Sequence, residues 1–254
     1  MLLAVDIGNS LTKFGLFDGS ELTSKFSIHT NNATVDSISQ AVSDRLSSGD
    51  VSEIAICSVV PGVELIFAEF LINTTGVEPL FIRNDRDFGI RVDYQPLESI
   101  GTDRLVNAST AARKYGSPVV VCGLGTATTI DAVADGEFRG GIIAPGMRTM
   151  AKALFLNTSQ LPDIDITRPD NVFGTSTDQS IRSGVYWGYV GLIEGILTRM
   201  ITEIAESPRV VATGGAAAVI AGDCLLIEVV DETLTLEGIA MLAAHQDHSA
   251  VSPA

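Results

Sequence analysis

The sequence is poor in basic residues, cysteine and tryptophan, and it contains no long apolar run. Its 254 residues include 16 Lys and Arg against 31 Asp and Glu, which gives a formal net charge of −15. Phosphate backbones bind to clustered positive charge, so a surface this acidic repels them. The composition therefore predicts that neither nucleic acid nor an anionic membrane surface is a partner.

Cysteine usage and the amino-terminal residues predict a cytoplasmic protein. Cys57, Cys122 and Cys224 are odd in number, far apart and embedded in apolar runs. This pattern is typical of buried thiols in a reducing compartment rather than of disulfides or a metal site. The carboxylate of Asp6 comes too early for a signal peptide, and no apolar run approaches the roughly 18 residues that a membrane span needs.

Hydrophobic patterning predicts a mixture of strands and helices, and so the α/β class. Strands are expected at residues 2–5, 13–17, 21–29, 51–59, 78–82, 118–122, 127–134, 138–143, 209–213 and 225–230. Helices are expected at residues 35–46, 63–71, 103–115, 147–156, 177–205, 216–220 and 234–244. Residues 85–100 and 161–175 have no clear periodicity and are expected to be irregular.

An internal repeat predicts two related domains. Residues 6–19 align without a gap to residues 123–136, and each copy has an apolar strand, a turn with glycine, a second strand and an Asp-Gly turn. Self-similarity of this kind is typical of duplication. We therefore expect duplicated domains at residues 1–113 and 114–254, facing each other across a nucleotide.

The turn after the first strand carries groups suited to phosphate. A tight turn containing glycine exposes backbone N–H groups to an anion. Asp6 suits Mg²⁺, directly or through water, and Lys13 can neutralise phosphate charge. One such turn alone is better interpreted as an Asx-capped hairpin, whereas a second copy favours phosphate binding. The sequence has neither a P-loop nor a Gly-x-Gly-x-x-Gly motif, so a nucleotide site must be of another type.

A second candidate site is the tetrapeptide Gly101-Thr102-Asp103-Arg104, which lies where a loop meets a predicted helix. Backbone N–H groups at a helix start favour an anion, and Asp103 can accept a proton from a hydroxyl. Arg104 can hold a carboxylate or phosphate through two hydrogen bonds. The alternative, which the tetrapeptide alone favours, is a helix cap with a surface ion pair.

Together these motifs resemble those of the type III pantothenate kinases, nearly from end to end. The motifs, in order, are Asp6-Ile-Gly-Asn-Ser-Leu-Thr-Lys13, Tyr94-Gln-Pro96, Gly101-Thr-Asp-Arg104, Gly125-Thr-Ala-Thr-Thr129, Gly140-Gly-Ile-Ile-Ala-Pro-Gly146, Gly174-Thr-Ser-Thr177 and Thr213-Gly-Gly215. The family belongs to the acetate and sugar kinase/Hsp70/actin superfamily. The resemblance implies two duplicated ribonuclease H-like, actin-like domains with mixed sheets and a nucleotide cleft between them. It also implies ATP-dependent phosphorylation of pantothenate to 4′-phosphopantothenate, the first step of coenzyme A biosynthesis, by a homodimer.

The resemblance further implies roles for individual residues. Asp103 is the expected general base for the primary hydroxyl of pantothenate. The expected ATP and Mg²⁺ contacts are Asp6, Ile7, Gly8, Asn9, Ser10, Leu11, Thr12 and Lys13, with Asp6 nearest the metal, and Thr126 in the second turn. The expected pantothenate contacts are Tyr94, Gly101, Thr102, Asp103, Arg104 and, across the dimer, Thr177.

One position departs from the family pattern. The family's second turn begins with an Asp that binds an activating monovalent cation, K⁺ or NH₄⁺, and this sequence has Gly123 there. Either the cation is dispensable, or another carboxylate such as Asp131 replaces it, or the protein is an impaired or regulatory paralogue. The intact tetrapeptide around Asp103 favours an active kinase. A kinase or phosphatase acting on a different substrate is a third interpretation.

Overall fold

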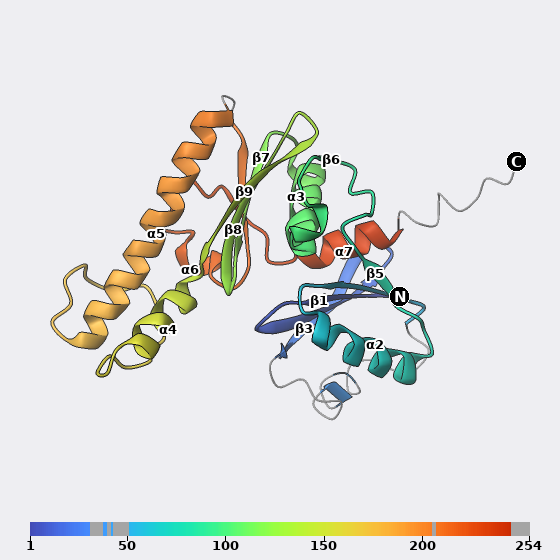
Figure 1. The fold of residues 1–254 in the computed structure, drawn as a ribbon, viewed down its shortest axis with the longest axis horizontal. Helices are drawn as coiled ribbons and strands as arrows, with labels where there is room; N and C mark the ends of the chain where they lie inside the picture. The colour runs from blue at the N-terminus through green and yellow to red at the C-terminus, as the bar shows by residue number, and fades with distance from the viewer. Residues whose placement is uncertain (31–37, 40–41, 43–50, 205–206, 245–254) are drawn as a thin grey trace, which may run out of the picture. The chain divides into compact units, whose positions relative to one another are not determined.

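The computed structural model describes residues 1–30, 38–39, 42, 51–204 and 207–244 (Figure 1). The chain divides into two compact units. The first unit holds residues 1–89, 94–110 and 233 onward, and the second holds residues 90–93 and 111–232. In the described part of the chain, no helix is both long enough and apolar enough to cross a membrane.

The first unit is built on a mixed five-stranded sheet with the strand order β3-β2-β1-β4-β5. Its strands are β1 (Leu2–Ile7), β2 (Leu11–Asp18), β3 (Glu21–His29), β4 (Glu53–Ser58) and β5 (Leu80–Ile82). The three amino-terminal strands are antiparallel neighbours, whereas β4 runs parallel to β1. Every residue of β1 from Leu3 to Ile7 is buried, and since successive side chains point to opposite faces of a strand, the sheet is covered on both faces here.

Helices cover both faces of this sheet (Figure 1). Helix α2 (Pro61–Thr75) contributes Phe67, Phe70 and Leu71 to the core on one face. Helix α7 (Leu234–Ala244) packs against β1, β2, β4 and β5, and Thr235 donates a hydrogen bond to Asn107 Oδ1 at 2.8 Å. Asn107 belongs to α3 (Thr102–Tyr115), which continues into the second unit.

The second unit holds a mixed six-stranded sheet with the order β11-β10-β7-β8-β9-β6. Its strands are β6 (Arg91–Val92), β7 (Val119–Leu124), β8 (Ala127–Ala134), β9 (Glu137–Pro145), β10 (Arg209–Thr213) and β11 (Val229–Val230). Its further helices are α4 (Met147–Asn157), α5 (Thr177–Ile204) and α6 (Ala217–Ile220). The fully buried Tyr186 and Tyr189 of α5 anchor that helix to the core of the sheet.

The two sheets repeat one topology, because β3-β2-β1-β4-β5 corresponds to β9-β8-β7-β10-β11. Even the irregularity recurs: the β2–β3 register shifts after Leu16, and the β8–β9 register shifts after Ala132. The duplication predicted from the sequence is confirmed, but the ungapped alignment is wrong by one residue. Asp6 pairs with Lys13, whereas Gly123 pairs with Thr129, so the second turn is one residue shorter.

Most predicted elements that fall on described residues are present, with three differences. Residues 85–100, expected to be irregular, contain β6 and the short 3₁₀ helix η2 (Leu97–Ser99). The strand predicted at residues 225–230 is only β11. The helix predicted at residues 35–46 lies mainly outside the described residues, although 38, 39 and 42 are helical.

The third difference concerns helix α7, which lies at the end of the predicted second domain but packs in the first unit. It packs against β1, β2, β4 and β5 of that unit. The boundary between residues 113 and 114 stays a prediction. Cys57, Cys122 and Cys224 are buried free thiols, as expected.

Candidate active site

The first candidate phosphate turn joins β1 to β2 in the first unit. Gly8 N donates to Leu11 O at 3.1 Å, which closes the turn. Asn9, Ser10 and Leu11 form its exposed tip, whereas Ile7 and Thr12 are fully buried at its base. The turn therefore presents backbone and polar side-chain groups to solvent on an apolar support.

Thr30 braces this turn, and no sequence pattern identified it. Its hydroxyl donates to Gly8 O at 2.7 Å and lies 3.0 Å from the Thr12 hydroxyl. Because the Thr30 hydrogen is used on Gly8, Thr12 is the donor between the two hydroxyls. Thr30 N also donates to Ser10 O at 3.0 Å. Thr30 is 22 residues beyond Gly8, and only the pairing of β2 with β3 brings it there.

Asp6 and Lys13 face each other across β1 and β2 beneath this turn. Lys13 Nζ lies 3.6 Å from Asp6 Oδ2, and Asp6 is 8% exposed. Burial raises the pKa of Asp6 to about 6, against the attraction of Lys13, and the negative charge of Asp103 adds to the increase. An oxygen ligand of this kind suits Mg²⁺, which would also relieve the cost of burying the charge.

The second candidate segment lies at the start of α3 in the same unit. Arg104 N donates to Asp103 Oδ1 and to Gly101 O, each at 2.9 Å. The Asp103 carboxylate folds back so closely that a Cβ on Gly101 would lie 2.6 Å from Oδ1. Burial raises the pKa of Asp103, which opposes the lowering effect of the hydrogen bond from Arg104 N. Asp103 is half-buried, and a carboxylate of raised pKa is a stronger proton acceptor.

A cavity of about 550 Å³ adjoins this segment, entirely within the first unit. Its walls include Ser58 at the end of β4 and the following Val59, Asn84 after β5, and Gly101 and Thr102. Arg104 is buried beside it, and Tyr94 is half-buried in the preceding segment. The structure thus brings the predicted Asp6–Lys13 turn and the 101–104 segment into one unit, and the charges of Asp6 and Asp103 influence each other.

In the second unit, the shorter turn after β7 is braced in the same way as the first. Gly125 N donates to Ala127 O at 3.1 Å, and Gly146 N donates to Thr126 O at 3.1 Å. The Thr149 hydroxyl also donates to Thr126 O, at 2.6 Å. In the first turn, Ser10 O accepts a hydrogen bond from Thr30 N, and in the second turn Thr126 O accepts one from Gly146 N. Thr126 is therefore the counterpart of Ser10.

Gly123 does not supply a charged ligand for a monovalent cation. It stands at the end of β7 in register with Thr129 on β8 and Thr213 on β10. Thr213 is 3% exposed, and within the described residues its Oγ1 has no hydrogen-bond partner. A buried hydroxyl without a partner is rare, and that of Thr213 lies next to Gly123, the position at which the family pattern has an aspartate. The side chains present therefore do not fit a carboxylate-bound cation at residue 123.

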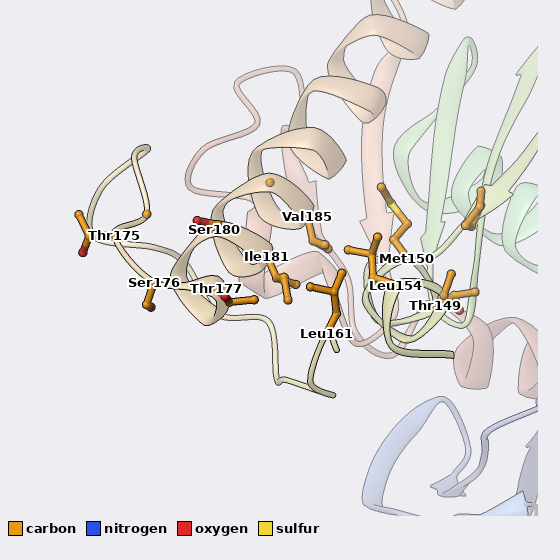
Figure 2. A pocket seen from close by; sticks show the side chains of 14 residues that line it. Thr149, Met150, Leu154, Leu161, Thr175, Ser176, Thr177, Ser180, Ile181 and Val185 are labelled. Atoms are coloured by element: carbon orange, nitrogen blue, oxygen red, sulfur yellow. The ribbon is translucent and has the colours of Figure 1, made fainter. Parts of the chain in front are cut away.

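Thr177 lies apart from this turn, at the mouth of an apolar groove of about 1060 Å³ between α4 and α5 (Figure 2). Met150 and Leu154 from α4 face Ile181 and Val185 from α5, and Leu161 closes one side. Further apolar side chains nearby are exposed: Leu156 by 65% and Phe173 by 90%. Large apolar exposure of this kind usually marks an interaction surface.

The sequence is similar to known kinases over almost its whole length. The profile of the type III pantothenate kinase family matches residues 2–199. A type III pantothenate kinase of Desulfosudis oleivorans is 41% identical over 252 residues, which cover 96% of this chain and 99% of that protein. The type III pantothenate kinase of Syntrophobacter fumaroxidans is 40% identical over 250 residues, covering 95% and 97%.

Solved structures show the same fold at lower sequence identity. A conserved putative Baf family transcriptional activator from Campylobacter jejuni superposes with a TM-score of 0.60 and 20% identity, covering 97% of this chain and 99% of that one. A ROK family glucokinase from Streptomyces griseus in complex with glucose and AMPPNP superposes with a TM-score of 0.54 and 14% identity, covering 96% and 99%. The expected superfamily fold of two mixed sheets is confirmed.

Proposed function

The chain belongs to the type III pantothenate kinase family, whose members phosphorylate pantothenate with ATP in coenzyme A biosynthesis, and we propose that Asp103 is its general base. The observation that carries this assignment is the half-buried Asp103 carboxylate at the start of α3, which lies beside the cavity and whose negative charge raises the pKa of Asp6. Asp103 accepts the proton of the primary hydroxyl of pantothenate as the hydroxyl oxygen forms a bond to the γ-phosphorus of ATP, while the bond from that phosphorus to the β,γ-bridging oxygen breaks and ADP leaves. Gly101, Thr102, Arg104 and Tyr94 hold pantothenate around it.

The first turn holds the phosphates of ATP. Backbone N–H groups and polar side chains of residues 6–13 contact them, and Thr126 of the second turn contacts ATP as the counterpart of Ser10. Lys13 places a positive charge where negative charge develops on the transferred group. Bound Mg²⁺ neutralises phosphate charge, and Asp6 holds it directly or through a water molecule. The reaction uses ATP and pantothenate, both cytoplasmic metabolites, and we place the enzyme in that compartment.

Asp103→Asn tests the assignment of the base. The amide keeps the size of the side chain but cannot take a proton, so kcat should fall by a factor on the order of 10² to 10⁴. Calorimetry should show ATP still binding, because Asp103 is not a phosphate ligand. Loss of less than tenfold in kcat would show that another group removes the proton.

Residue 123 is a glycine and offers no carboxylate to a monovalent cation, which supports a kinase that works without K⁺ or NH₄⁺. The assay with ATP, Mg²⁺ and pantothenate should give the same rate whether the salt is KCl, NH₄Cl or NaCl. A rate that depends on K⁺ would assign the cation to another carboxylate, such as Asp131. Nothing in the comparisons favours the alternative of a regulatory paralogue, and the absence of turnover in every salt would support it.

The groove between α4 and α5 supports a homodimer in which Thr177 reaches the pantothenate of the partner subunit. A second copy would cover Leu154, Leu156 and Phe173, which are otherwise exposed. Light scattering after gel filtration should give twice the chain mass of 26.7 kDa.

Leu156→Glu should yield monomers with a higher KM for pantothenate. The control Leu225→Glu replaces an 87%-exposed leucine outside the groove and should stay dimeric. A monomeric wild type at assay concentrations would contradict the proposal.

A further inference from the structure

We propose that Asn84 is a positioning residue that holds the substrate-binding segment of residues 97–102 in its active conformation. The proposal rests on the proposed function of the 101–104 segment, and it concerns a residue that belongs to none of the motifs recognised in the sequence. Asn84 does not touch the reacting atoms. It acts on the backbone that carries Gly101 and, through Thr102, on the start of α3.

Every polar group of the Asn84 side chain is used on this segment. Nδ2 donates to Leu97 O at 2.9 Å and to Ile100 O at 2.7 Å. Oδ1 accepts the Thr102 hydroxyl at 2.5 Å. The side-chain amide has two donor hydrogens and one carbonyl oxygen, so one amide group bridges three points of the segment. A carboxylate at this position could serve only the third of them.

Apart from those to Asn84, the hydrogen bonds of this segment join residues that are close in sequence. The segment consists of the three-residue η2, the extended and buried Ile100, Gly101 and the first residue of α3, and β6 is the nearest strand before it. Ser99 donates to Pro96 O from its N at 3.1 Å and from its hydroxyl at 2.7 Å, and Ile100 N donates to Leu97 O at 3.3 Å. Asn84 follows β5, which is hydrogen-bonded into the sheet through β4. The amide therefore ties a short loop to the rigid sheet.

This connection matters because the segment ends at the reacting groups. Gly101 O accepts Arg104 N, and the Asp103 carboxylate lies directly over Gly101. A displacement of Ile100 moves Gly101, and with it both the cavity wall and the carboxylate. Misplacement of reacting groups by about 1 Å can cost on the order of 100-fold in rate. By contrast, the phosphate turn is braced separately by Thr30 and does not depend on Asn84.

Asn84→Asp tests the inference in the full-length enzyme. It preserves shape and the acceptor for Thr102 but replaces both donors with an oxygen that repels the Leu97 and Ile100 carbonyls. We expect kcat/KM for pantothenate to fall at least tenfold, with a higher pantothenate KM, while the KM for ATP stays within twofold. If Asn84→Asp does not fold, Asn84→Ser, which adds no charge, should likewise raise the KM for pantothenate and leave the KM for ATP within twofold.

Thr75→Ala is the matched control. Thr75 also joins side chain to backbone in the first unit, donating to Leu71 O at 2.7 Å and accepting from Val77 N at 3.2 Å, but at the end of α2. Its removal should lower the melting temperature without changing either KM. Rates are normalised to the folded fraction measured at the assay temperature.

Two results would overturn the inference. One is a pantothenate KM in both Asn84 variants equal to that of the wild type. The other is an equal change in the KM values for ATP and pantothenate, which indicates a general loss of structure. If the wild type itself shows no turnover, the proposed function fails rather than this inference.

Discussion

Lys13 Nζ lies 3.6 Å from Asp6 Oδ2, yet the pKa of Asp6 is raised to about 6 rather than lowered. Burial of the carboxylate outweighs the attraction of the ammonium, because desolvation penalises the charged form. The ligand-free protein thus carries an unfavourable negative charge at Asp6 above pH 6. A destabilising buried charge of this kind is common where a protein must retain a group that binds a ligand.

Asp6→Asn should therefore stabilise the ligand-free protein while removing its activity. With a folded pKa of about 6 and a normal value of 3.8, native Asp6 takes up protons more readily than unfolded Asp6. The stability that this provides is complete below pH 3.8 and is lost as the pH rises through 6. The variant should gain up to about 3 kcal/mol over wild type at pH 8 and nothing near pH 3.8.

Thermal melts of both proteins from pH 4 to pH 8 would measure this difference. Asp18→Asn, at an exposed carboxylate at the end of β2, is the control and should show no pH-dependent gain. A variant that is less stable than wild type at pH 8 would show that the ion pair with Lys13 dominates instead.

Gly101→Ala should lower kcat because the new methyl group occupies the place of the Asp103 carboxylate. The added Cβ would lie 2.6 Å from Oδ1, so the carboxylate must rotate away. We expect a loss of at least tenfold in kcat with ATP affinity unchanged. Gly62→Ala on α2, whose Cβ would meet nothing within 4 Å, should retain full activity. Full activity of Gly101→Ala would mean that Asp103 functions in a different rotamer.

Gly123→Asp should raise activity and K⁺ dependence together. The new carboxylate would stand beside the Thr213 hydroxyl, which has no partner among the described residues, and would supply a charged oxygen ligand. The measurement is the ratio of rates in KCl and NaCl, expected to be about one in wild type and clearly higher in the variant. Gly222→Asp adds the same charge at an exposed position of the second unit and should leave the ratio unchanged. An unaltered ratio in Gly123→Asp would show that the cation role is not recovered by this residue.

Local patterns predicted much of this fold. The strands at residues 21–29, 127–134 and 209–213 and the helix at residues 234–244 have the predicted bounds, because each is a periodic run between clear turn signals. Glycine, aspartate and threonine at short spacing also locate the turns after β1 and β7 and the start of α3. They do not predict the one-residue difference between the two turns, since aligning letters cannot reveal which residues are paired across strands.

Local sequence is enough to place groups that lie within a few consecutive residues: Asp6 and Lys13 on one hairpin, and Gly101 to Arg104 at one helix start. The contacts that hold these groups become visible only in the folded chain. Thr30 reaches Gly8 from 22 residues away, Asn84 reaches Ile100 from 16, and α7 covers a sheet formed by the other end of the chain. Such contacts depend on which side chains strand pairing and core burial bring together, and no local pattern encodes that outcome.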